Sequence, residues 1–473
     1  MELSLRRNPI RYFVYQLPAW FRPVLPISGG ILTFLTFGTY YTAGNVTPYI
    51  ASYLRAYVDP SITMNQMVWF FCMQMNFPPL FVSVGGWMDR KLGLRITCMI
   101  ASITMSLGVL LTYFTLNHSY FMTLFTYGLM FGAGRNLSYG PPISCAMKWL
   151  PKNRGLATGL VCMGFGAGAL IFSPIQTRYV NPWNYQPNAD GYFTQPELLE
   201  RVPQLFLLLG IVYLVLQFVG VFFLVRPLKH GVVVSAEEEK ARLLKHHDSY
   251  TDTHWVPMTD VLKTVTFWWL FMSFFFSSPV INMVSSFYKS FGQTFIADDI
   301  FLAAVSSVAS VFNAFGRIVW GVVSDKYSYQ IAMALASCIQ AFLMLTFDLT
   351  PFGGKAMFLI WVSGLNFAFS SNFVLFPYAL AKCFGSQNMT INYGFLTLGL
   401  LVSSCLISGM ANGLLHSIGY SGVWFICAGL VMITFFLTVT IQLTRYGKGI
   451  THAIRRREAK ALDKGIRKMT VTF

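Results

Sequence analysis

The chain has 473 residues, of which 55% are hydrophobic and 11% are charged, and its mean hydropathy is +0.55. Soluble proteins carry roughly twice that charged fraction, so the composition excludes an ordinary soluble enzyme and indicates a polytopic membrane protein. The net charge of +16 does not indicate a nucleic-acid partner, because most basic residues fall in the tails and in the loops between predicted membrane segments.

Apolar runs long enough to cross about 30 Å of hydrocarbon as a helix recur along the chain. They predict an all-α membrane protein with twelve transmembrane helices, over residues 28–55, 64–87, 94–116, 120–147, 155–176, 204–226, 264–288, 300–323, 329–348, 356–382, 390–416 and 420–443. The longest polar stretch separates the sixth run from the seventh. We therefore expect a tail over 1–27, a six-helix bundle over 28–226, a linker over 227–263, a second six-helix bundle over 264–443 and a basic tail over 444–473.

The basic residues are distributed unevenly between the two sides of the predicted membrane. Of the 34 Lys and Arg residues, 27 fall in the tails and in the loops after the even-numbered helices, and five fall on the other side. The positive-inside rule then predicts that both termini are cytoplasmic. Separately, we expect the plasma membrane, with an organellar membrane as the alternative. The basic C-terminal tail is expected to lie against anionic lipid.

A short motif occurs twice, six predicted helices apart. GGWMDRKLGLR (residues 85–95) follows the second helix and GVVSDKYSYQ (residues 321–330) follows the eighth, and each contains Gly, three residues, Asp and a basic residue. Such internal repetition is typical of secondary transporters. The chain resembles the major facilitator superfamily over nearly its whole length. The resemblance implies a cytoplasmic gate formed by Asp89, Arg90, Asp325 and Lys326.

Three longer segments carry a finer resemblance, over residues 38–55, 148–175 and 370–394. They are similar to the oxalate:formate antiporter family and to the related monocarboxylate porters. This implies a secondary-active carrier of small organic anions that works by alternating access. We expect it to function as a monomer.

Two arginines lie deep in predicted helices. Arg135 is about 20 Å from the cytoplasmic end of the fourth helix and Arg317 about 12 Å from that of the eighth, whereas all 18 acidic residues fall in loops, tails or helix ends. An unpaired arginine at that depth costs from about 3 to over 10 kcal/mol. The missing negative charge is therefore interpreted as the substrate. The alternative is that backbone carbonyls freed by the prolines of YGPP (residues 139–142) satisfy Arg135.

Both resembled families place a carboxylate-binding arginine where Arg317 stands in FNAFGRIVWG (residues 312–321). A guanidinium suits this role because its planar fork gives two parallel donors to one carboxylate. Two departures limit the resemblance: residues 392–404 lack the lysine of the oxalate antiporters, and Asn313 stands where monocarboxylate porters have an aspartate. Anion exchange, or a proton carried on the substrate acid, therefore fits better than a protonated carboxylate in the site.

The favoured substrates are monocarboxylates of the lactate, pyruvate and formate type. The alternatives are a dicarboxylate exchanger of the oxalate type and a sensor or trafficking protein that does not transport. Further polar residues are candidate substrate contacts, although each could instead form an interhelical hydrogen bond: Tyr41, Asn45, Tyr139, Asn282, Asn313, Asn366 and Asn372. No catalytic constellation, metal-ligand spacing or cofactor motif is recognised in the sequence. The stretch GFGAGA (residues 164–169) resembles a dinucleotide-binding loop, but it lies within a predicted membrane helix.

Overall fold

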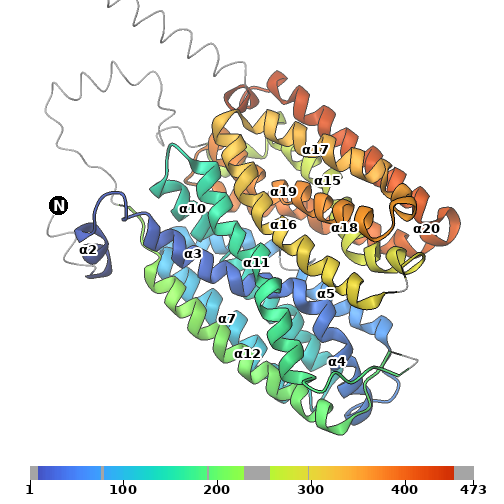
Figure 1. Ribbon diagram of the computed structural model, residues 1–473. Helices are drawn as coiled ribbons and strands as arrows, with labels where there is room; N and C mark the ends of the chain where they lie inside the picture. Colours follow the sequence, from blue (N-terminus) through green and yellow to red (C-terminus); the bar gives the residue numbers. More distant parts are fainter. Residues whose placement is uncertain (1–8, 76–78, 189–190, 228–255, 297, 452–473) are drawn as a thin grey trace, which may run out of the picture.

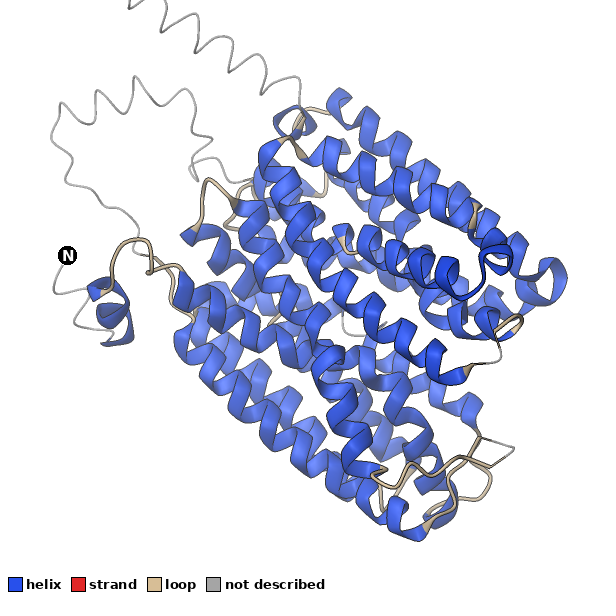
Figure 2. Ribbon diagram, viewed as in Figure 1, coloured by secondary structure: helices blue, strands red, loops and turns tan. Residues whose placement is uncertain are grey.

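The computed structural model describes residues 9–75, 79–188, 191–227, 256–296 and 298–451, and within these ranges the chain is nearly all helical, with no strand (Figure 2). Two helical bundles lie side by side, one coloured blue to green and the other yellow to red (Figure 1). Most of the expected linker and of the C-terminal tail, and the first eight residues, lie outside the described residues. The predicted all-α fold with two bundles is confirmed.

The first bundle begins after a short helix α2 (Pro9–Gln16). Its helices, in chain order, are α3 (Val24–Phe37), η1 (Gly38–Thr42), α4 (Ala43–Tyr57), η2 (Met64–Met67), α5 (Val68–Met75), α6 (Pro79–Lys91), α7 (Leu94–Thr115), α8 (Tyr120–Thr123), η3 (Leu124–Met130), α9 (Phe131–Leu137), α10 (Gly140–Trp149), α11 (Arg154–Val180) and α12 (Pro196–Phe223). Several membrane-length segments are thus made of shorter helices joined end to end.

The second bundle contains several longer helices together with short ones. They are α14 (Met258–Val261), α15 (Val265–Gln293), α16 (Asp299–Lys326), α17 (Tyr329–Leu345), η4 (Phe347–Leu349), α18 (Thr350–Phe369), α19 (Ser371–Phe384) and α20 (Met389–Thr440), followed by η5 (Ile441–Leu443) and η6 (Gly447–Ile450). Gly419 has φ of +66°, and it divides α20 into the two antiparallel segments that the sequence predicts as separate helices.

The two bundles meet closely at one end, which we call the terminal face because α3 begins and α20 ends there; the other end is the distal face (Figure 1). Glycines let α11 approach α16: a Cβ on Gly155 would lie 2.3 Å from the carbonyl oxygen of Gly321. Between α6 and α20, the Ser83 hydroxyl donates to the Ile391 carbonyl at 3.3 Å. The bundles are therefore packed together at the terminal face.

The first membrane segment changes its winding midway. Residues Gly38–Thr42 form the 3-10 helix η1 between α3 and α4. Threonine hydroxyls bond the carbonyl three residues earlier, Thr39 to Thr36 at 2.6 Å and Thr42 to Thr39 at 2.7 Å. This local bonding supports a tighter turn, and it brings both Tyr40 and Tyr41 to the interface between the bundles.

Candidate anion-binding cavity

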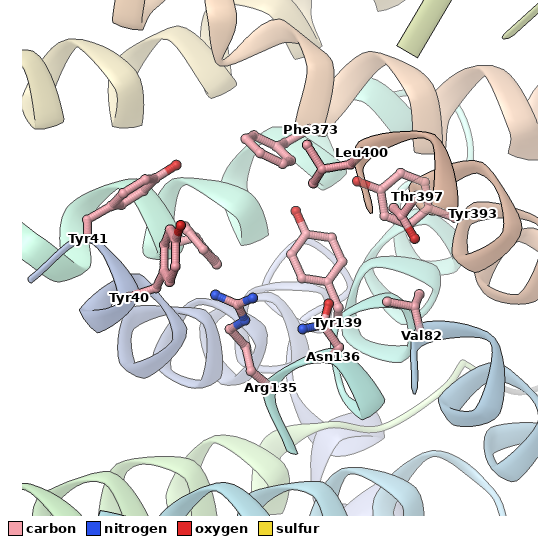
Figure 3. A pocket seen from close by; sticks show the side chains of 11 residues that line it. Tyr40, Tyr41, Val82, Arg135, Asn136, Tyr139, Phe373, Tyr393, Thr397 and Leu400 are labelled. Carbon is pink, nitrogen blue, oxygen red and sulfur yellow. The ribbon is translucent and has the colours of Figure 1, made fainter. Parts of the chain in front are cut away.

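A cavity lies between the two bundles (Figure 3). Its walls are aromatic, with a small number of polar groups and, among the residues lining it, no carboxylate. The lining residues are Tyr40, Tyr41, Val82, Arg135, Asn136, Tyr139 and Phe165 from the first bundle and Phe373, Tyr393, Thr397 and Leu400 from the second. A largely apolar concave space with few convergent polar groups is typical of small-molecule sites.

Arg135 brings a positive charge into this cavity from α9, near the middle of its membrane segment (Figure 3). The residue is 3% exposed. One terminal nitrogen donates to the Gln74 carbonyl at 2.8 Å, and the guanidinium carbon lies 4.9 Å from the centre of the Tyr40 ring. A backbone carbonyl therefore holds Arg135, but it is that of Gln74 in α5 and not one within residues 139–142, and the guanidinium also faces the cavity.

Arg317 lies behind the cavity wall. It is fully buried and is not among the lining residues. Its Nε donates to Asn313 Oδ1 at 3.1 Å, and one terminal nitrogen donates to the Cys162 carbonyl of the other bundle at 3.0 Å. The other terminal nitrogen lies 3.5 Å from the Tyr41 hydroxyl. In this conformation the guanidinium therefore links the two bundles.

The two guanidinium groups share one aromatic neighbour. The guanidinium carbons of Arg135 and Arg317 lie 5.9 and 5.0 Å from the centre of the Phe165 ring, so they are at most about 11 Å apart. Two like charges at that distance repel by about 1.5 kcal/mol at an effective dielectric constant of 20. An anion between or beside them relieves this repulsion, which gives the cavity a physical preference for negatively charged ligands.

Two pairs of nearly parallel rings cross the interface at the cavity. Tyr139 stacks with Tyr393 at a centroid distance of 5.7 Å and an interplanar angle of 17°. Phe165 stacks with Phe373 at 6.4 Å and 23°. Each pair takes one ring from each bundle, so a movement of the bundles apart must separate both pairs.

The remaining predicted contact residues lie elsewhere. Asn45 donates to the hydroxyl of Thr177 at 3.0 Å and thus joins α4 to α11. Asn366 donates to the Val362 carbonyl of its own helix at 3.0 Å, and its own carbonyl accepts from Asn313 at 3.2 Å.

Two further asparagines were predicted to contact substrate. Asn372 is 1% exposed beside the cavity residue Phe373, and neither its side-chain nitrogen nor its oxygen makes a hydrogen bond within the described part of the chain. The side chain of Asn282 lies outside the described residues. Of the predicted contacts, the structure thus brings Arg135, Tyr41 and Tyr139 together around the cavity, and it places Arg317 and Asn313 in the layer behind.

Several lining residues were missed by sequence reasoning: Tyr40, Val82, Asn136, Phe165, Phe373, Tyr393, Thr397 and Leu400. Helical spacing offered one signal. Tyr393, Thr397 and Leu400 lie four and three residues apart and therefore share one face of α20. The same reasoning links Arg135 to Tyr139, four residues later.

The second copy of the repeated loop joins the bundles. The Asp325 carboxylate, at the end of α16, accepts from the backbone N–H groups of Gly155 at 2.9 Å and Leu156 at 2.7 Å. These groups begin α11 in the other bundle, where the partial positive charge of the helix terminus favours an anion. Lys326 beside it is exposed, with its ammonium 5.4 Å from the Tyr327 ring.

The first copy has different partners. Asp89 forms an ion pair with Arg226, which follows α12 in the same bundle. Arg90 instead reaches the second bundle, where it donates to Asn388 Oδ1 at 2.7 Å. Asn388 in turn donates to the Val256 carbonyl at 3.1 Å, and the Val256 N–H donates to the Phe384 carbonyl at 3.2 Å.

Residues 30–408 match the family model described as "Major Facilitator Superfamily". The chain belongs to the major facilitator superfamily. Like other members, it is an integral membrane protein and a secondary transporter of small molecules.

Relatives within the superfamily are distant. The chain is 28% identical over 465 residues to the apicoplast pyruvate carrier 1 of Toxoplasma gondii, with 85% of each chain covered. It is 24% identical to the oxalate:formate antiporter of Oxalobacter formigenes, covering 78% of this chain and 81% of that protein.

Solved structures of the superfamily share the fold. An E. coli fucose:proton symporter superposes with a TM-score of 0.61 at 13% identity, covering 89% of this chain and 99% of the other. A proton:xylose symporter superposes with a TM-score of 0.65 at 12% identity, covering 91% and 98%.

Proposed function

We propose that this major facilitator carries small monocarboxylates of the pyruvate, lactate and formate type. The observation that carries the proposal is the Arg135 guanidinium in a cavity between the bundles whose lining residues include no carboxylate. A monocarboxylate brings one negative charge to this guanidinium, and aromatic walls suit its short apolar remainder. Relatives named as a pyruvate carrier and an oxalate:formate antiporter support carboxylates as the substrate class.

Transport proceeds by alternating access between the two bundles. The contacts of α11 with α16 and of α6 with α20 hold the terminal face together in this conformation, with Arg90 and Asp325 as the gate residues that reach the other bundle. Asp89, which the resemblance also implies for the gate, pairs with Arg226 of its own bundle instead. Opening that face separates Arg317 from Cys162 and Tyr41, because these partners belong to the other bundle. The substrate carboxylate then replaces the lost partners, so Arg317 contacts substrate in the second conformation.

The coupling mode is exchange of anions or entry of a proton on the substrate acid. The lining residues contain no group that gains or loses a proton near neutral pH. Asn313, the Oδ1 of which accepts from Arg317, is an amide and does not titrate. Exchange and proton cotransport differ in their need for internal anion.

Uptake into proteoliposomes tests this function. We expect labelled pyruvate, lactate or formate to enter faster than into empty liposomes, and oxalate to enter more slowly. Parallel vesicles with and without internal anion, each at pH 5.5 and pH 7.5, separate exchange from proton cotransport. Absence of uptake of all four acids under all conditions contradicts the proposal and favours the sensor alternative.

Replacing Arg135 or Arg317 should reduce transport more than replacing an arginine near the distal face. Charge-assisted hydrogen bonds contribute about 1.5–3 kcal/mol, so Arg135→Gln and Arg317→Gln should each lower uptake at subsaturating substrate by at least about tenfold. Arg201→Gln is the matched control, because Arg201 lies 4.5 Å from the Trp183 ring near the distal face. Equal uptake by Arg135→Gln and Arg201→Gln would exclude Arg135 as a substrate contact.

We infer that both termini are cytoplasmic, from the 27 basic residues that the sequence places on the terminal side, and we favour the plasma membrane as the location. An organelle is the competing location, since one relative is named as an apicoplast carrier. Microscopy of a tagged chain, with antibody access to the tag before and after permeabilising the plasma membrane, tests both inferences.

A further inference from the structure

We propose that, while the terminal face is closed, Phe165 makes the carrier select monocarboxylates over dicarboxylates by screening Arg317 from the cavity, so that the two cations do not bind one dianion together. The inference rests on the proposed function, because it concerns the same cavity. It assigns to one aromatic side chain a role in substrate selection that its type and position in the sequence do not suggest.

Phe165 contacts both buried arginines. Both buried guanidinium groups lie against its ring, with carbon-to-centroid distances of 5.9 Å for Arg135 and 5.0 Å for Arg317. Arg135 lines the cavity and Arg317 does not, whereas Phe165 is itself part of the wall. The ring therefore lies against both cations and forms part of the wall that separates Arg317 from the cavity; we call this wall the partition.

The second bundle completes the partition. Phe373 also lines the cavity, stacks with Phe165 at 6.4 Å and lies 4.9 Å from the Arg317 guanidinium carbon. Arg317 is thus covered by two rings, and it is 0% exposed. A ligand in the cavity meets the charge of Arg135 directly and that of Arg317 across a hydrocarbon wall.

The charge of the ligand decides the consequence. A monocarboxylate has one negative charge, and that charge binds Arg135. A dicarboxylate brings a second anionic group, which would be buried among aromatic rings without a direct cation, and this desolvation is unfavourable. The guanidinium carbons are at most about 11 Å apart, and with the ring removed a short dicarboxylate such as malonate or succinate could bridge that span with one carboxylate at each guanidinium.

The test measures a gain of binding. Equilibrium binding of labelled pyruvate and labelled succinate is compared on the purified full-length carrier in detergent. We expect the wild-type protein to prefer pyruvate, and Phe165→Ala to bind succinate at least tenfold more tightly than wild type. Adding Arg317→Gln to Phe165→Ala should abolish that gain, because one end of the dianion then has no cation.

A matched control comes from the same helix. Phe172 also lies on α11 and is 3% exposed, but it packs edge-on against Tyr213 within the first bundle and does not line the cavity. Phe172→Ala should leave the preference for pyruvate unchanged. Phe373→Ala opens the same partition from the other bundle, so this variant should also bind succinate more tightly. It replaces Phe165→Ala as the test if Phe165→Ala does not give folded protein.

The outcomes separate the two proposals. Wild-type protein that binds pyruvate, with no gain of succinate in either ring variant, overturns the role of Phe165 and leaves the proposed function standing. Wild-type protein that binds no monocarboxylate overturns the proposed function itself. A succinate gain that persists in Phe165→Ala with Arg317→Gln shows that the added space, and not the second cation, admits the dianion, and it contradicts the partition.

Discussion

The two copies of the repeated loop share a sequence pattern but hold different parts of the molecule together. In the second copy, Asp325 crosses to the start of α11 in the other bundle. In the first copy, Asp89 pairs with Arg226 inside its own bundle, and the basic residue Arg90 crosses instead.

The first glycine of each motif differs in the same way. A Cβ on Gly321 would lie 2.3 Å from the Gly155 carbonyl oxygen across the interface, and one on Gly85 would lie 1.9 Å from the Leu137 carbonyl oxygen within the first bundle. A repeated motif can therefore be kept for closing the gate in one half and for holding a bundle together in the other.

The largest effects are expected from alanine at these two glycines, because backbone oxygens cannot move aside cheaply. Gly85→Ala should destabilise the first bundle, with a loss of several degrees in thermal unfolding temperature. Gly321→Ala should instead push the bundles apart at the terminal face. Spin labels at Leu92→Cys and Tyr327→Cys, both exposed near that face, report the separation in a background without the eight native cysteines. Identical label distances in both variants would refute the division of roles.

Asp325→Asn should have the next largest effect. An amide keeps one acceptor oxygen but loses the charge that the α11 N-terminus favours, at a cost of about 2 kcal/mol. The population with an open terminal face should then rise by about 30-fold, seen with the same label pair. An unchanged distance distribution would remove Asp325 from the gate.

Asp89→Asn should lower stability without opening the gate. Its carboxylate is 6% exposed and its partner Arg226 29% exposed, so the ion pair is partly desolvated and its loss costs about 1–2 kcal/mol. Thermal unfolding measures the loss, and the label distances should stay as in the wild type. A shift toward open distances equal to that of Asp325→Asn would make the two copies equivalent.

The smallest effect is expected from Arg90→Ala, which removes one hydrogen bond to Asn388 at the edge of the interface. One such hydrogen bond contributes about 0.5–1.5 kcal/mol to the closed conformation, so its loss should raise the population with an open terminal face a few-fold. Lys326→Ala is its matched control, since Lys326 is exposed beside Tyr327, and it should leave the distances unchanged.

The sequence was sufficient to predict the helices and the repeat, because hydrophobic length and a short motif are local signals. The partners of the motif were not predictable. Arg226 lies 137 residues after Asp89, and many other basic residues flank the predicted membrane segments. Only the packing of α12 against α7 and α3 brings the residue that follows α12 to Asp89.

The sequence predicts the positive charge of the cavity, but it does not predict which residues form the cavity walls. An arginine at membrane depth is rare enough to be noticed, so Arg135 and Arg317 could be named from the sequence. Aromatic residues make up 16% of the chain, so a single ring such as Phe165 or Tyr393 carries no signal. Its importance depends on which cation lies against it, and helix packing decides that.

The short 3-10 segment in the first membrane helix has a mechanical consequence. Successive residues turn by about 120° in a 3-10 helix and by about 100° in an α-helix, with rises of about 2.0 and 1.5 Å. Rewinding Gly38–Thr42 as α-helix would rotate α4 by about 100° relative to α3 and draw it inward by about 2.5 Å. Tyr40 and Tyr41 would be carried round with it, so a change of pitch over five residues is enough to replace one wall of the cavity with another.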